Sequence, residues 1–136
     1  MKVVFDTNIL VSALVFPGGQ AETALLRIVE EKDQLALSKA ILDELLGVLA
    51  RKFAREAEEL ARVAIFLSEL SQAVRPRRRL HAVRDEPDNR ILECALAARA
   101  HVIVTGDKAL LELKEYRGVR IISLREYLTA GDSTAG

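Results

Sequence analysis

The feature that most constrains the fold of this chain is a short apolar run at residues 3–5, Val-Val-Phe, almost at the amino terminus. The run does not alternate between apolar and polar residues, which is typical of a strand buried on both faces in a parallel sheet. Asp6 ends the run and is followed by Thr7 and Asn8. An acid in this place lies at the carboxyl edge of the sheet, where open α/β sheets bind ligands, although aspartate also favours simple turns.

Apolar runs and amphipathic stretches alternate along the rest of the chain. Strands are predicted at residues 35–37, 73–74, 102–104 and 119–122, and helices at residues 21–32, 39–52, 53–70, 87–98, 108–116 and 124–128. The expected fold class is α/β, with a central parallel sheet of about five strands flanked by helices in three layers. We place one domain at residues 1–130 and expect a disordered tail at residues 131–136.

Composition limits the possible partners. The 136 residues are enough for one domain with a sizeable core. Twenty basic and twenty acidic side chains cancel, so attraction to nucleic acid requires a local basic patch.

The single cysteine, Cys94, excludes an internal disulfide and fits a helix core. No signal peptide or membrane span is predicted, so a cytoplasmic protein without a membrane partner is the default expectation.

One dense basic run follows the strand predicted at residues 73–74. It contains Arg75, Arg77, Arg78 and Arg79. Guanidinium groups in such a cluster can contact the phosphates of RNA without reading its bases. A solvated loop is the alternative, and the balanced overall charge leaves both interpretations open.

Glu44 is a second acid that can face inward. In the helix predicted over residues 39–52 it falls at the edge of the apolar stripe, roughly 40° from Val48 and 60° from Ile41. Its neighbour Asp43 points about 160° away from Ile41 and is expected to face solvent. A solvated glutamate at the boundary of the stripe is the alternative.

Asp88 and Asp107 complete a set of four acids. Asp88 lies in the first turn of its helix, on the face shared with Ile91 and Leu92, and can be a helix cap or an inward carboxylate. Asp107 follows the strand at residues 102–104 after Thr105 and Gly106, which repeats the polar ending of the first strand. Burying such a carboxylate is costly unless a positive group meets it.

These four acids, Asp6, Glu44, Asp88 and Asp107, can converge at one carboxyl edge. Several carboxylates within a few Å cannot all stay ionised unless their pKa values rise or a cation binds. Oxygen ligands without paired histidine or cysteine favour Mg²⁺ or Mn²⁺ over Zn²⁺. The chemistry that follows is metal-assisted hydrolysis of a phosphodiester bond.

Taken in order, the motifs resemble those of the PIN-domain ribonucleases. They are Asp6-Thr7-Asn8, Glu44, Asp88-Asn89 before an Ile-Leu-x-x-Ala helix, and Thr105-Gly106-Asp107. The resemblance covers nearly the whole chain and is strongest to small prokaryotic PIN proteins assigned as toxins of toxin-antitoxin pairs. It implies a sheet of order 3-2-1-4-5, a catalytic Mg²⁺ or Mn²⁺ site at the four acids, and endonucleolytic cleavage of single-stranded or structured RNA.

The same resemblance implies that Thr7, Asn8 and Thr105 support the site, and that the chain forms a homodimer held by a cognate antitoxin protein. Asp85 could replace or assist Asp88, although the spacing to the helix favours Asp88.

A catalytically silent PIN-like module that binds RNA or protein is one alternative to the nuclease function. A haloacid-dehalogenase-like phosphatase is another, but it needs a second acid where this chain has Asn8.

Overall fold

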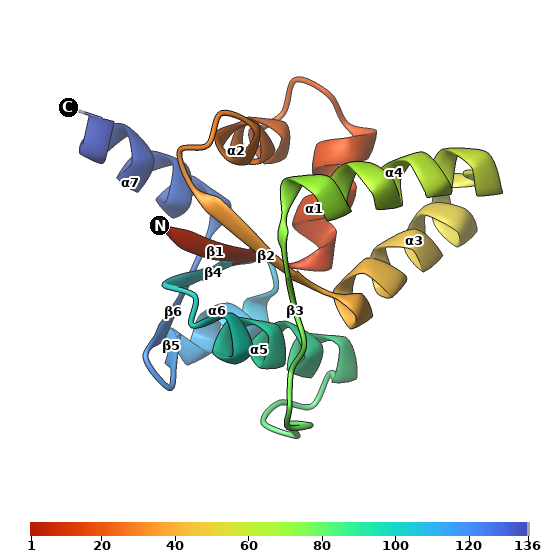
Figure 1. Ribbon diagram of the computed structural model, residues 1–136. Coiled ribbons are helices and arrows are strands. Elements are labelled where there is room, and N and C mark those ends of the chain that lie inside the picture. The colour runs from red at the N-terminus through yellow and green to blue at the C-terminus, as the bar shows by residue number, and fades with distance from the viewer. Residues whose placement is uncertain (136) are drawn as a thin grey trace.

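Six strands form one sheet, in the order β3-β2-β1-β4-β6-β5, in the computed structural model, which describes residues 1–135 (Figure 1). The strands are β1 (Lys2–Phe5), β2 (Gln34–Ser38), β3 (Gln72–Val74), β4 (Val102–Val104), β5 (Glu115–Tyr116) and β6 (Val119–Ile122). All neighbours pair in parallel except β5 and β6, which are antiparallel. The fifth predicted strand, at residues 119–122, is β6 in the structure. When the two-residue β5 is left out, the strand order therefore matches the predicted 3-2-1-4-5, and the predicted fold class is confirmed.

The short strand β5 corrects the prediction of a helix over residues 108–116. Helix α6 (Lys108–Leu113) ends where Lys114 adopts a φ of 62°. Arg117 and Gly118 then join β5 to β6, both at positive φ (48° and 89°), as in a two-residue hairpin turn. Arg-Gly is a weaker signal for such a turn than Asn-Gly, which explains why the sequence pattern did not predict the strand.

Helices cover both faces of the sheet. On one side lie α1 (Thr7–Val15), α2 (Gln20–Val29) and α7 (Leu124–Ala135), and on the other lie α5 (Glu86–Ala98) and α6 (Figure 1). The remaining pair, α3 (Lys39–Phe53) and α4 (Ala57–Leu70), projects beyond the sheet as a helical hairpin. Within residues 1–135 no single helix is long and apolar enough to cross a membrane, and α1 and α2 meet that criterion only as a pair bent by 97°.

Other helices also differ from the prediction, and α2 ends at Val29 instead of residue 32. Residues 7–15, which had no predicted element, form α1 behind Asp6, its N-cap residue. Helix α4 begins at Ala57 instead of residue 53, because Ala54 adopts a left-handed φ of 51° that ends α3. Helix α7 extends past the predicted 124–128 and overlaps the predicted tail of residues 131–136, of which residue 136 lies outside the described residues.

The core lies between the sheet and the two helical layers. Residues 3–5 are at most 1% exposed, and Phe5 packs edge-on against the ring of the buried Tyr127 at a centroid distance of 5.7 Å. Cys94 is buried in α5, as predicted. The register pairs Phe5 with Val104, so β1 and β4 end side by side at the same edge of the sheet.

Candidate active site

Three of the predicted acids meet at the carboxyl edge of the sheet. Asp6 follows β1 directly, and its backbone N–H donates to the carbonyl of Val104 in β4 at 2.9 Å. Asp107 follows β4 after two loop residues, and Asp88 lies in the first turn of α5. Because the parallel strands β1 and β4 are adjacent, the fold brings together side chains that are about 100 residues apart in the sequence.

Thr105 connects the two strand ends. Its hydroxyl donates to Asp6 Oδ2 at 2.6 Å and accepts the backbone N–H of Asp107 at 2.9 Å. The side chain has no exposed surface. These contacts orient the carboxylate of Asp6 and fix the backbone at Asp107.

Asp88 is the most strongly perturbed acid of the group. It is 6% exposed, and its Oδ2 atom has no hydrogen-bond partner among the described residues. Burial, followed by the negative charges of Asp107, Asp85 and Asp6, raises the pKa of Asp88 to about 7. Burial also raises the pKa of Asp6, although the hydrogen bond from Thr105 opposes that effect.

Asp85 and Asp88 have different roles in the structure. Asp85 is the exposed N-cap residue of α5, and its Oδ1 accepts the backbone N–H of Asp88 at 3.3 Å. Asp88 is therefore free of the capping role and lies buried beside Asp6 and Asp107. The geometry supports the choice of Asp88 over Asp85 as the inward acid.

Glu44 lies apart from the three aspartates. It is half-buried on α3 and lines a hollow of about 310 Å³ together with Thr7, Arg79 and Arg90. Asn8 is exposed, and its backbone N–H donates to Asp6 Oδ1 at 3.5 Å. The structure therefore places Thr7 in the hollow with Glu44, whereas the side chain of Asn8 faces solvent.

A divalent cation fits the chemistry of this edge, although no ligand set is preassembled. Among residues 1–135, no three histidine, cysteine, aspartate or glutamate side chains are arranged to hold a metal ion together. The buried Oδ2 atom of Asp88 has no partner among the described residues and lies within the influence of other negative charges, so it is the kind of group that a cation satisfies. Hard oxygen donors favour Mg²⁺ or Mn²⁺ in this place.

Asn89 is a residue whose structural role the sequence pattern did not reveal. It is fully buried, and its Oδ1 accepts the backbone N–H groups of Ala82 and Val83 at 2.9 and 3.0 Å. Its Nδ2 donates to the Val83 carbonyl at 2.9 Å. Asn89 therefore fastens the loop between β3 and α5 to the helix that carries Asp88. Its position directly after Asp88 was the only available signal.

The predicted basic run divides between two hollows. Arg79 lines the hollow that contains Glu44 and Thr7. Arg75, Arg77 and Arg78 line a separate hollow on the outer side of α5. The sequence predicts one basic patch, whereas in the structure the arginines extend from the hollow beside Glu44 along α5.

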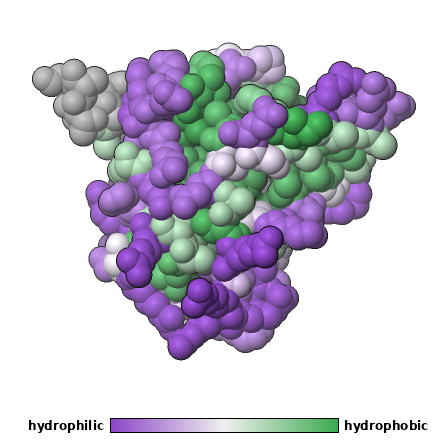
Figure 2. All heavy atoms as spheres, viewed as in Figure 1, coloured by the Kyte–Doolittle hydropathy of each residue, from purple (hydrophilic) through white to green (hydrophobic). Residues whose placement is uncertain are grey.

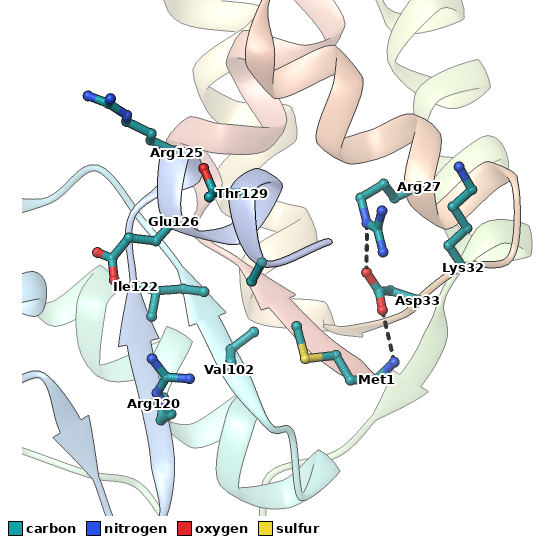
Figure 3. Close-up of a pocket in the computed structure, with 11 residues that line it drawn as sticks. Met1, Arg27, Lys32, Asp33, Val102, Arg120, Ile122, Arg125, Glu126 and Thr129 are labelled. Carbon is teal, nitrogen blue, oxygen red and sulfur yellow. Dashed lines mark hydrogen bonds and ion pairs between the residues drawn. The ribbon is translucent and has the colours of Figure 1, made fainter. Parts of the chain in front are cut away.

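A further cavity lies at the opposite end of the sheet, beside the residues where β1 and β4 begin (Figure 3). It measures about 710 Å³ and includes Met1, Asp33 and Val102. Asp33 is already satisfied there, because it accepts from the Met1 amino group at 2.8 Å, from Arg27 at 3.0 Å and from the Tyr127 hydroxyl at 2.6 Å. This cluster ties three segments together, and the acids at the carboxyl edge remain the better candidate for chemistry.

Comparison with known proteins defines the class of protein. A family model described as PIN domain matches residues 2–109, and this chain belongs to the PIN domain family. PIN domains are generally nucleases that use divalent metal ions. The uncharacterized protein MJ1680 of Methanocaldococcus jannaschii is 34% identical over 119 residues, which cover 85% of this chain and 76% of that protein.

Two solved structures share the fold. The structure of VapBC2 from Rickettsia felis, bound to a DNA fragment from the VapBC2 promoter, matches with a TM-score of 0.66 at 20% identity. That match covers 90% of this chain and 98% of the other. VapBC-1 from nontypeable Haemophilus influenzae matches with a TM-score of 0.61 at 19% identity, over 92% of this chain and 99% of the other.

The perturbed pKa of Asp88 predicts how stability depends on pH in metal-free protein. The folded-state pKa of about 7 exceeds the unfolded value near 3.9, so the free energy of unfolding should fall as the pH rises from about 4 to 7. Asp88→Asn removes the titration and should raise that free energy at pH 8 by about 1–3 kcal/mol, with less effect at pH 4.

Urea unfolding at pH 4, 6 and 8 with EDTA measures this effect. Asp43→Asn is the matched control, because Asp43 is exposed and pairs with Lys39 Nζ at 2.7 Å on the surface of α3. Parallel stability curves for wild type and Asp88→Asn would show that Asp88 does not titrate as the structure indicates.

Proposed function

We propose that this chain is a metal-dependent endoribonuclease that hydrolyses RNA phosphodiester bonds, with Asp6, Glu44, Asp88 and Asp107 as its catalytic and metal-binding residues. The observation that carries the proposal is the buried, partnerless carboxylate oxygen of Asp88 beside Asp6 and Asp107. Such a group is costly in an empty apolar setting, and a divalent cation relieves both the burial and the repulsion. Membership of the PIN domain family supports nuclease chemistry at this edge.

When bound, Mg²⁺ or Mn²⁺ supplies a Lewis acid for the phosphate and lowers the pKa of water. Thr105 holds the Asp6 carboxylate through its hydroxyl, and the backbone N–H of Leu110 holds the Asp107 carboxylate at 2.9 Å. Asp88, with a pKa near neutrality in the metal-free chain, can take up or release a proton at its unpartnered Oδ2. Glu44 lines, from α3, the hollow that Thr7 and Arg79 also line. In this proposal Arg79 contacts a phosphate of the substrate.

We further propose that the chain is the toxin of a toxin-antitoxin pair, bound by a cognate antitoxin and dimeric. The fold shared with the two VapBC structures supports this assignment. Apolar side chains are also exposed on the outer surface, among them Phe16, Ile65 and Phe66. Figure 2 shows apolar surface over the region of α4. A protein partner would remove such surface from water.

Metal-dependent RNA cleavage by the purified full chain tests the enzymatic proposal. We expect cleavage of single-stranded or structured RNA in millimolar Mn²⁺ or Mg²⁺, loss of cleavage in EDTA, and recovery when excess metal is restored. The silent binding module is the competing function, and it is favoured by the lack of a preassembled ligand set among the described residues. A folded protein that cleaves no RNA from a varied set with either ion would establish that alternative.

A further inference from the structure

A basic hollow of about 470 Å³ lies on the outer side of α5, away from the four acids. It is formed by the loop after β3, the second half of α5 and the turn between β5 and β6. Five arginines line it, and we call it the arginine pocket: Arg75, Arg77, Arg78, Arg99 and Arg117. The loop after β3 lies at the bottom of Figure 1, where Figure 2 shows a strongly hydrophilic surface.

The positive charge of this pocket is not neutralised by the described part of the chain. Its one acid, Glu93, already accepts from Arg90 and from the backbone N–H of Leu80, both at 2.7 Å. Within residues 1–135 the guanidinium groups of Arg75, Arg77, Arg78 and Arg99 form no hydrogen bond or ion pair. Arg117 lies over the ring of Tyr116, 5.2 Å from its centroid.

Several unpaired guanidinium groups around one hollow repel each other and attract an anion. Their forked donors match the oxygens of phosphate, often with two hydrogen bonds at once. Because the chain has no net charge, this attraction is local to the pocket. The chemistry of the pocket therefore favours a ligand with several phosphate groups.

One short segment of the chain contributes arginines to both the pocket and the hollow beside Glu44. The basic run passes from Arg75, Arg77 and Arg78 in the pocket to Arg79 in the hollow beside Glu44. Along α5, Ala97 in the pocket lies roughly 13 Å from Asp88 at the acidic edge, given a rise of 1.5 Å per residue. An RNA strand of a few nucleotides is long enough to reach from the acidic edge to the pocket.

We propose that the arginine pocket binds the phosphate backbone of the RNA strand on one side of the cleavage site, with Arg99 and Arg117 as binding residues. This inference rests on the proposed function, because it takes RNA as the substrate. Arg99 and Arg117 come from a helix end and a hairpin turn, far from the basic run in sequence. They position the strand and take no part in the chemistry at Asp6.

The backbone at these two positions allows a clean test. Arg99 and Arg117 have φ values of 54° and 48°, in the left-handed region that glycine adopts without strain. Arg99→Gly and Arg117→Gly therefore remove the charges while keeping the fold, and their melting temperatures should equal or exceed that of wild type. Lys114→Gly is the matched control, because Lys114 is also a cation at positive φ (62°) but does not line the pocket.

The measurement is equilibrium binding of a labelled 12-nucleotide single-stranded RNA in EDTA, by fluorescence anisotropy at several salt concentrations. Arg99→Gly and Arg117→Gly should each weaken binding several-fold and lower the slope of log K against log salt by about 0.7, and the double variant by about 1.4. Lys114→Gly should match wild type. Slopes for the pocket variants equal to that of the control would overturn the proposal.

A competition arm separates an RNA backbone from a free phosphate group. Inorganic phosphate or a mononucleotide, at the same phosphate concentration, should displace the RNA much less than an unlabelled 12-nucleotide strand. Equal displacement would make the pocket a site for a single phosphate group and would also overturn the proposal. These binding readouts need no cleavage, so failure of the nuclease proposal and failure of this one are distinguishable.

Discussion

Replacing Asp6 with asparagine is expected to abolish metal-dependent RNA cleavage while leaving the chain folded. Asp6 is 5% exposed, and its carboxylate receives hydrogen bonds from Thr105 Oγ1 and the Asn8 N–H. Asparagine keeps the shape and removes the charge that would hold a cation. The cleavage rate should fall by more than the roughly 10–100-fold that loss of an outer-shell partner costs.

Asp43→Asn is the matched control for this experiment. Asp43 neighbours Glu44 on α3 but is exposed, and it pairs with Lys39 on the surface. We expect this variant to cleave RNA at the wild-type rate. Cleavage rates and thermal melts should be measured together, so that a loss of activity is not confused with unfolding. If the two variants retain or lose activity equally, the carboxyl edge is not the active site.

Divalent metal is expected to stabilise the folded chain, and more strongly at pH 8 than at pH 5.5. An ion that binds only the folded state contributes about 2.7 kcal/mol at 100 times its Kd, which corresponds to a rise in Tm on the order of 5–10 °C. At pH 5.5 a proton occupies Asp88, whose pKa is raised to about 7, and competes with the ion. Thermal melts with EDTA, Mg²⁺ and Mn²⁺ at both pH values measure the shift.

Variants separate binding at the acidic edge from binding elsewhere. Asp88→Asn and Asp6→Asn should reduce the metal-dependent rise in Tm, whereas Asp43→Asn should retain it. An unchanged Tm across millimolar Mg²⁺ and Mn²⁺ at pH 8 would count against a metal site formed by these acids. The result is independent of RNA, so it tests the site even if the correct substrate is not in the assay.

The sequence alone was sufficient to predict the strands that organise the fold. The runs at residues 3–5 and 102–104 are continuous and apolar because β1 and β4 are buried on both faces of a parallel sheet. A strand of this kind ends at a predictable edge, so Asp6 and Asp107 could be placed there from local pattern. Helical periodicity also separated the exposed Asp43 from the half-buried Glu44.

Only the tertiary structure decided which groups meet. It made Asp85 the cap and Asp88 the buried acid, linked Asp6 to Asp107 through Thr105, and brought Arg99 and Arg117 to the basic run. It also formed α1 and the β5–β6 hairpin, whose turn lacks a strong sequence signal. Periodicity describes how one element faces the core, whereas these contacts join elements far apart in the sequence. Their geometry depends on strand order, register and loop conformation, which a single local pattern does not specify.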